Sequence, residues 1–96
     1  MVEETTDMKT IMFYDIAPDG LSKAKDNIDG HRERLLEFHE KGLLLMAGPL
    51  ANPTDGAIGI FTNMDAAKDF IEGDPFVKNG VVGKYRLVEW NEVLME

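Results

Sequence analysis

The apolar residues of this chain gather in short runs that predict strands. The runs at 11–14, 43–47 and 57–61 contain apolar or β-prone residues with little polar alternation, which is typical of short strands. The run at 43–47, Leu-Leu-Leu-Met-Ala, has no polar residue, so we expect this strand to be buried on both faces. The segment 81–93 mixes apolar and charged residues and predicts a partly exposed last strand that bends at Gly83.

A helical spacing of apolar residues precedes the second of these runs. His31, Leu35 and Phe38 fall on one stripe of a helix, and Gly42 suits the left-handed conformation that ends one. We expect Asp29 to be the N-cap, because a longer helix would contain an internal glycine at a cost of about 1 kcal/mol relative to alanine. This start places His31 in the first turn of the predicted helix.

A second helix is predicted between the third and fourth strands. Thr62 or Asn63 can cap it, Phe70 lies on its buried face, and Gly73 ends it. The Asp-Pro-Phe sequence at 74–76 then has the pattern of a new N-cap followed by proline at the first helical position. We therefore expect one short helical turn before the last strand.

The predicted order of elements, βαββαβ, determines a fold class. Two β-α-β units with right-handed crossovers form a four-stranded antiparallel sheet with both helices on one face, which is the ferredoxin-like α+β arrangement. Strands that are apolar on both faces leave the other face of that sheet uncovered. We therefore predict a homodimer in which the two sheets pack together.

Length and charge limit the domain organisation and the partners. The 96 residues suffice for one domain, which we place at 9–96 after a polar, acidic segment, 1–8, that we expect to be loose. Ten basic and 18 acidic side chains give a net charge of −8. This charge argues against nucleic acid or an anionic membrane as a partner, because both require basic residues gathered on one face.

Residue usage excludes several kinds of site. The chain has no cysteine, so it has no disulfide, thiolate metal site or cysteine nucleophile. His31 and His39 are separated by about 12 Å along a helix, too far to bind one metal ion as an i, i+4 pair. We expect neither a metal nor another cofactor.

No apolar segment is long enough to span a bilayer, and no basic n-region begins the chain, so the expected location is the cytoplasm.

Several short motifs, taken in order, resemble the YciI-like (YCII-related) family. They are His31 at an amphipathic helix, the sequence Gly-Leu-Leu-Leu-Met-Ala-Gly-Pro-Leu, an Asp-Gly pair before a strand, Asp-Pro-Phe, and a last strand that ends in tryptophan. The resemblance covers residues 9 to 91 and implies membership of the dimeric α+β barrel superfamily. It also implies an active-site pair formed by His31 and Asp74. One position departs from the family, whose members often have an arginine three residues before the histidine, where this chain has Ile28.

This pair is suited to proton transfer. The positive end of the helix dipole would keep an imidazole in the first turn neutral, and a carboxylate would fix its tautomer. We therefore predict a small-molecule enzyme of the lyase or isomerase type, with His31 as general acid/base and Asp74 as its partner. The alternative is a dimeric binding module without catalysis, in which His31 is a structural residue and Asp74 only a helix cap.

Four further residues are expected to contact the substrate. Gly48 and Pro49 form the corner after the second strand, and Phe76 belongs to the Asp-Pro-Phe motif. Arg86 shares one face of the last strand with Lys84 and is a candidate for binding an anionic group, the alternative being that both charges are solvated.

Overall fold

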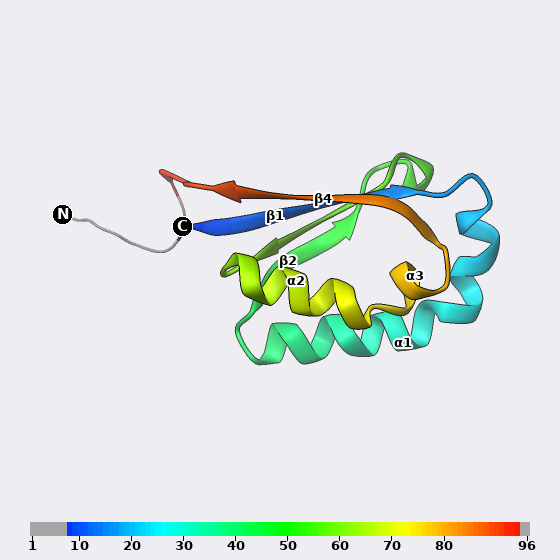
Figure 1. Ribbon diagram of the computed structural model, residues 1–96, viewed down its shortest axis with the longest axis horizontal. Helices are drawn as coiled ribbons and strands as arrows, with labels where there is room; N and C mark the ends of the chain where they lie inside the picture. The colour runs from blue at the N-terminus through cyan, green and yellow to red at the C-terminus, as the bar shows by residue number, and fades with distance from the viewer. Residues whose placement is uncertain (1–7, 95–96) are drawn as a thin grey trace.

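The computed structural model describes residues 8–94 and contains two layers, a sheet and the helices that cover one of its faces (Figure 1). Its elements, in chain order, are β1 (Lys9–Ile16), α1 (Gly20–Glu40), β2 (Leu44–Pro49), the 3₁₀ turn η1 (Pro53–Asp55), β3 (Ala57–Phe61), α2 (Met64–Gly73), α3 (Pro75–Lys78) and β4 (Val82–Trp90). Residues 1–7 of the predicted loose segment lie outside the described residues. No helix within residues 8–94 is long and apolar enough to cross a membrane.

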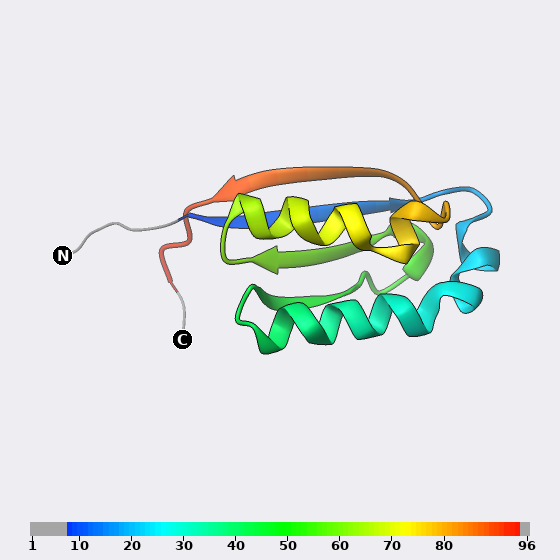
Figure 2. The ribbon, with the colours of Figure 1, turned by 60° about the horizontal axis from the view of Figure 1, so that its bottom comes forward.

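The sheet has the predicted ferredoxin-like topology. Its four strands are ordered β2-β3-β1-β4, and each neighbouring pair is antiparallel. Helices α1 and α2 run side by side on one face of the sheet (Figures 1 and 2). The α+β fold class and the placement of the helices are therefore confirmed.

The core lies between the sheet and the helices. Alternate residues of β1, namely Thr10, Met12 and Tyr14, are buried beneath the helices, as the period of a strand requires. Phe38 of α1 and Phe70 of α2 meet edge to face in the same layer, with ring centroids 5.2 Å apart. This packing joins the two helices, and Phe70 also contacts Phe61 of β3, with ring centroids 5.4 Å apart.

Helix α1 begins at Gly20, more than two turns before the predicted start. Asp29 is therefore an internal helical residue and does not cap it, so that prediction was wrong. The reason is a tertiary contact: α3 packs on α1 at Gly30, where an added Cβ would lie 3.1 Å from the ring of Pro75. Close packing at this point favours a glycine, because a side chain would not fit. The free-energy cost of a glycine inside an isolated helix was the reason for predicting that the helix starts at Asp29.

Strand β2 differs from its predicted burial. Leu44 is buried, but Leu45 and Met46 are 37% and 63% exposed in the single chain. The prediction of burial on both faces was wrong for the isolated chain, because β2 is an edge strand and α1 covers only its beginning. Its uninterrupted apolar sequence therefore faces solvent over much of its length.

The sheet face opposite the helices carries a cluster of apolar side chains. The register places Ile11 and Phe13 of β1 beside Ile60 and Ile58 of β3, and Met46 of β2 is paired with Ile60. Because directly paired residues share a face, all five side chains lie on the side away from α1 and α2. We call this surface, defined by Ile11, Phe13, Met46, Ile58 and Ile60, the open sheet face.

Candidate active site

His31 and Asp74 are brought into direct contact although 43 positions separate them. His31 Nδ1 lies 2.7 Å from Asp74 Oδ1. His31 projects from the middle of α1, and Asp74 lies at the junction between α2 and α3. The Asp74 side chain is completely buried, and that of His31 is 14% exposed. The two residues implied by the family resemblance thus form one cluster.

Asp74 accepts hydrogen bonds from three groups. In addition to His31, the Tyr14 hydroxyl donates to Oδ2 at 2.5 Å, and the backbone N–H of Phe76 donates to Oδ1 at 3.1 Å. The Phe76 bond is the predicted N-cap of α3, so the structural and the site roles of Asp74 coexist. Three donors around a buried carboxylate compensate for its lost hydration.

Tyr14 is a site residue that the sequence did not reveal. It lies on the inward face of β1, 60 positions from Asp74, and no spacing along the chain relates the two. Burial, followed by the charge of the Asp74 carboxylate, raises the pKa of the Tyr14 phenol above its ordinary value of 10.0. Tyr14 therefore remains protonated at neutral pH and serves Asp74 as a donor.

The orientation of the imidazole is fixed on two sides. Its ring is stacked on that of Phe76, with centroids 3.8 Å apart and an interplanar angle of 1°. Since the Asp74 carboxylate can only accept, Nδ1 of His31 carries the hydrogen and Nε2 is left as an acceptor. The expected effect of the helix dipole does not apply, because His31 lies far from the first turn of α1.

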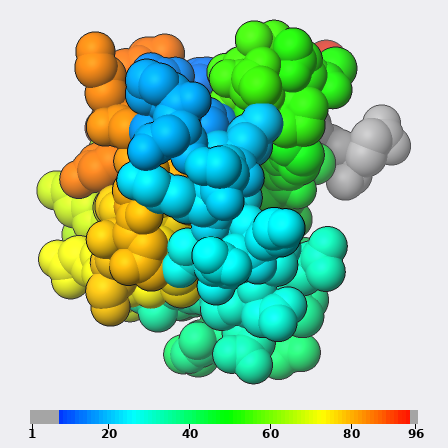
Figure 3. Space-filling model, turned by 90° about the vertical axis from the view of Figure 1, so that its right-hand side faces the viewer, coloured from blue at the N-terminus to red at the C-terminus, as the bar shows by residue number. Residues whose placement is uncertain are grey.

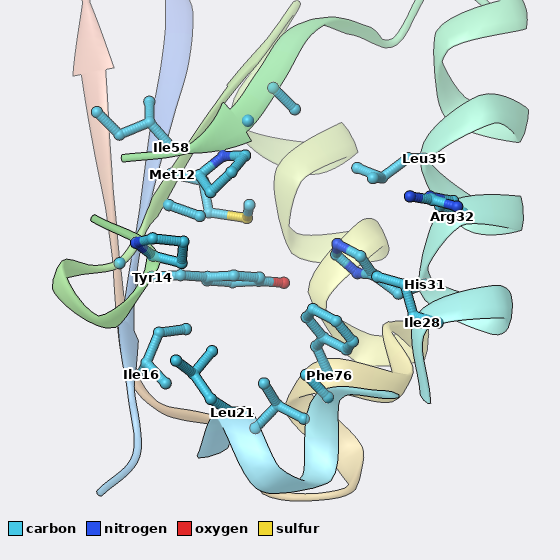
Figure 4. Close-up of a pocket in the computed structure, with 18 residues that line it drawn as sticks. Met12, Tyr14, Ile16, Leu21, Ile28, His31, Arg32, Leu35, Ile58 and Phe76 are labelled. Carbon is cyan, nitrogen blue, oxygen red and sulfur yellow. The ribbon is translucent and has the colours of Figure 1, made fainter. Parts of the chain in front are cut away.

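A cavity of about 360 Å³ adjoins this cluster. It is bounded by α1, β1, α3 and the connection between β2 and β3, segments that converge at the end of the molecule seen in Figure 3. The Tyr14 hydroxyl points across it toward His31 and Phe76 (Figure 4). Apart from Tyr14, His31 and Arg32, the side chains that line it are apolar, so the cavity suits a compact molecule with a largely apolar body.

The predicted substrate contacts divide between two faces of the sheet. Gly48, Pro49 and Phe76 line the cavity, and their contact with a substrate stays a prediction. Arg86 does not line it: its guanidinium lies over the ring of Phe13, 4.3 Å from the centroid, on the open sheet face. Ile28, where the resemblance implies an arginine, is part of the apolar wall.

The second histidine has a structural contact. His39 Nδ1 lies 2.8 Å from the carbonyl oxygen of Leu44, which ties the end of α1 to the start of β2. Within residues 8–94, no three histidine, cysteine or acidic side chains are grouped so that they could hold a metal ion. The polar side chains that the structure brings together at the site are those of His31, Asp74 and Tyr14.

Comparisons with known proteins agree with this architecture. The family model of the YCII-related domain matches residues 8–91. One similar structure, covering 90% of this chain and 96% of its own, is 5-chloro-2-hydroxyhydroquinone dehydrochlorinase (TftG) from Burkholderia phenoliruptrix AC1100 in complex with 2,5-dihydroxybenzoquinone, with 23% identity and a TM-score of 0.73.

A second similar structure is a candidate antibiotic biosynthesis monooxygenase from Bacteriodes thetaiotaomicron VPI-5482. It has 16% identity and a TM-score of 0.56, and the match covers 91% of this chain and 90% of the other. No curated protein matches the chain. At these identities the similar structures establish the fold.

Proposed function

Because the chain belongs to the YCII-related family, we propose that it is a small-molecule enzyme that catalyses proton transfer in a lyase- or isomerase-type reaction. His31 is its general acid/base and Asp74 orients the imidazole. The observation that carries this proposal is the 2.7 Å contact between His31 Nδ1 and a fully buried carboxylate at the wall of an apolar cavity. This arrangement leaves Nε2 available to a molecule in the cavity.

The geometry supports a simple sequence of steps. Nε2 of His31 takes a proton from a C–H or O–H group of the substrate, and the resulting imidazolium is stabilised by the Asp74 carboxylate. The electron pair left on the substrate forms a double bond, either with loss of a leaving group or with return of the proton at another atom. The first outcome is an elimination and the second an isomerisation.

The size and lining of the cavity support a ring compound as substrate. A volume of about 360 Å³ lies at the lower end of small-molecule sites, and its walls are mainly apolar. The structurally similar TftG is named as a dehydrochlorinase of a chlorinated hydroxyhydroquinone and was solved with a dihydroxybenzoquinone. Hydroxylated rings that undergo elimination are therefore the first compounds to test.

The test uses 5-chloro-2-hydroxyhydroquinone as the probe and chloride release as the readout. We expect wild type to release chloride and His31→Leu to be slower by roughly a factor of 100 or more while remaining folded, because the base is lost. Asp74→Asn should also lose activity, since its amide group can donate to Nδ1 and stabilise the wrong tautomer. His39→Gln is the matched control and should keep the wild-type rate.

Two outcomes would contradict the proposal. One is chloride release by wild type no faster than the uncatalysed rate; the other is an undiminished rate in His31→Leu. Binding of 2,5-dihydroxybenzoquinone with no turnover of the probe would instead favour a non-catalytic binding module. Circular dichroism of each variant checks that a variant with a lower rate of chloride release is still folded.

We also propose that the chain functions as a homodimer whose two copies pack through the open sheet face. This face presents five apolar side chains from three strands, none of which is buried in the single chain. A group of neighbouring apolar side chains on one surface is typical of a protein interface. Trp90 of β4, paired with Lys9, extends the apolar surface at one edge of the same face. A second copy is the simplest cover because a two-fold axis lets identical patches meet.

Sedimentation velocity at micromolar concentration tests the dimer. We expect wild type to sediment as a dimer and Met46→Glu, on the open sheet face, to sediment as a monomer because a carboxylate would be desolvated in the interface. Leu36→Glu on α1 is the matched control, because Leu36 is 60% and Met46 63% exposed in the single chain. A wild-type protein that stays monomeric would refute this interface.

A further inference from the structure

Two polar side-chain groups in the cavity remain available to a ligand. Of the three polar residues that line it, Tyr14 directs its hydroxyl to Asp74, and His31 uses Nδ1 for the same carboxylate. Nε2 of His31 and the guanidinium of Arg32 are left. No acidic side chain lines the cavity, so nothing in its described wall competes with a ligand for Arg32.

Arg32 differs from the other arginine of α1 in its contacts. Arg34 is held by the carbonyl oxygens of Phe70 and Asp69, at 2.9 and 2.7 Å, and so has a structural role. Arg32 makes no hydrogen bond or ion pair with another residue of the described part of the chain. Two of its neighbours one turn away, Ile28 and Leu35, are apolar wall residues of the cavity.

The alternative use of an exposed arginine on a helix is an ion pair along the surface. Such pairs form at both ends of α1, where Lys23 contacts Asp19 at 3.2 Å and Lys41 contacts Glu37 at 3.1 Å. Asp29 has the spacing to pair with Arg32 but lies outside contact distance. Figure 4 instead shows Arg32 on the wall formed by α1, beside Leu35 and near His31.

We propose that Arg32 binds an anionic oxygen of the substrate, so that the substrate class is a compact planar ring that carries a carboxylate, enolate or phenolate group. This inference rests on the proposed proton transfer at His31. The net charge of −8 repels anions in general, so a cation at the cavity is needed to admit one. A guanidinium binds such oxygens through two parallel N–H groups.

The position of Arg32 also has a consequence for the reaction. When Nε2 of His31 removes a proton from an sp³ ring carbon next to a carbonyl group, the electron pair of the broken C–H bond spreads to the carbonyl oxygen, which becomes an enolate oxygen. An oxygen bound by Arg32 would gain charge in that step, and the positive charge of the guanidinium would stabilise it. Arg32 therefore acts both in selecting an anionic substrate and in stabilising the developing negative charge.

Isothermal titration at neutral pH with two planar probes of the same shape tests the proposal. The first is 2,5-dihydroxybenzoquinone, a vinylogous acid that is ionised under these conditions, and the second is uncharged 2,5-diaminobenzoquinone. Arg32→Gln should weaken binding of the first probe by roughly tenfold or more, because the charge-assisted bonds are lost. Its binding of the second probe should change by less than about twofold. Lys68→Gln removes a positive charge from the exposed surface of α2, outside the cavity, and should alter neither affinity.

An equal loss for both probes would show that Arg32 only shapes the cavity, and an unchanged affinity for the acidic probe would refute the proposal. So would failure of wild type to bind the acidic probe. The result is independent of catalysis: if His31→Leu releases chloride at the wild-type rate while Arg32→Gln discriminates between the probes, the proposed reaction fails and the anion site stands. If His31→Leu loses chloride release while Arg32→Gln binds both probes as wild type does, the proposed reaction stands and only the anion site is refuted.

Discussion

Replacing Asp74 with alanine is expected to lower the free energy of unfolding by about 3 kcal/mol or more. The change deprives three groups of their acceptor, namely the Tyr14 hydroxyl, the His31 ring and the Phe76 N–H. The lost bond from Phe76 is the N-cap of α3. Asp74→Asn keeps an oxygen that can accept from Phe76 and should therefore be the less destabilised of the two.

Urea unfolding at pH 7 measures both variants. Asp19→Ala is the matched control for loss of a carboxylate beside a helix start, because Asp19 makes no side-chain cap and its contact with Lys23 is exposed. The urea midpoint of Asp19→Ala should stay close to that of wild type. If Asp74→Ala and Asp74→Asn unfold at the same urea concentration, the carboxylate does not cap α3 in the manner described.

Gly56→Ala is expected to destabilise the protein by about 3 kcal/mol, through backbone strain and a direct clash. Gly56 has a φ of 122°, which side chains with a Cβ rarely adopt, and an added Cβ would overlap the backbone carbonyl oxygen of Tyr14. The loop before β3 must then move away from β1. Because Tyr14 belongs to the site, we also expect weaker binding of 2,5-dihydroxybenzoquinone by the folded fraction of this variant.

Gly48→Ala provides the control within the same cavity. Both glycines line it, but an added Cβ at Gly48 meets no described atom within 4 Å. Its urea midpoint should stay close to that of wild type. Equal destabilisation of the two variants would mean that the close approach of Gly56 to β1 is not the cause of the lost stability.

The candidate site could be predicted only in part. Contact between His31 and Asp74 followed from a family resemblance, since a spacing of 43 residues carries no information about distance. Tyr14 was read as a strand residue, because strand periodicity reveals which side chains point inward but not what they meet there. Arg86 was predicted to bind an anionic group for a similar reason: the sequence shows that it is basic, but only the register places it on the face away from the cavity.

The features that could be predicted from the sequence are local ones: the order of the elements, the cap at Asn63, the positive φ of Gly42 and the cap at Asp74. Each of these depends on a few neighbouring residues, so the signal lies within one turn of the chain. The tertiary structure decided the rest. The start of α1 depends on packing of Pro75 against Gly30, and the site depends on a strand, a helix and a helix junction meeting around one buried carboxylate. Contacts between residues so far apart in sequence arise from the packing of whole elements, which no local pattern encodes.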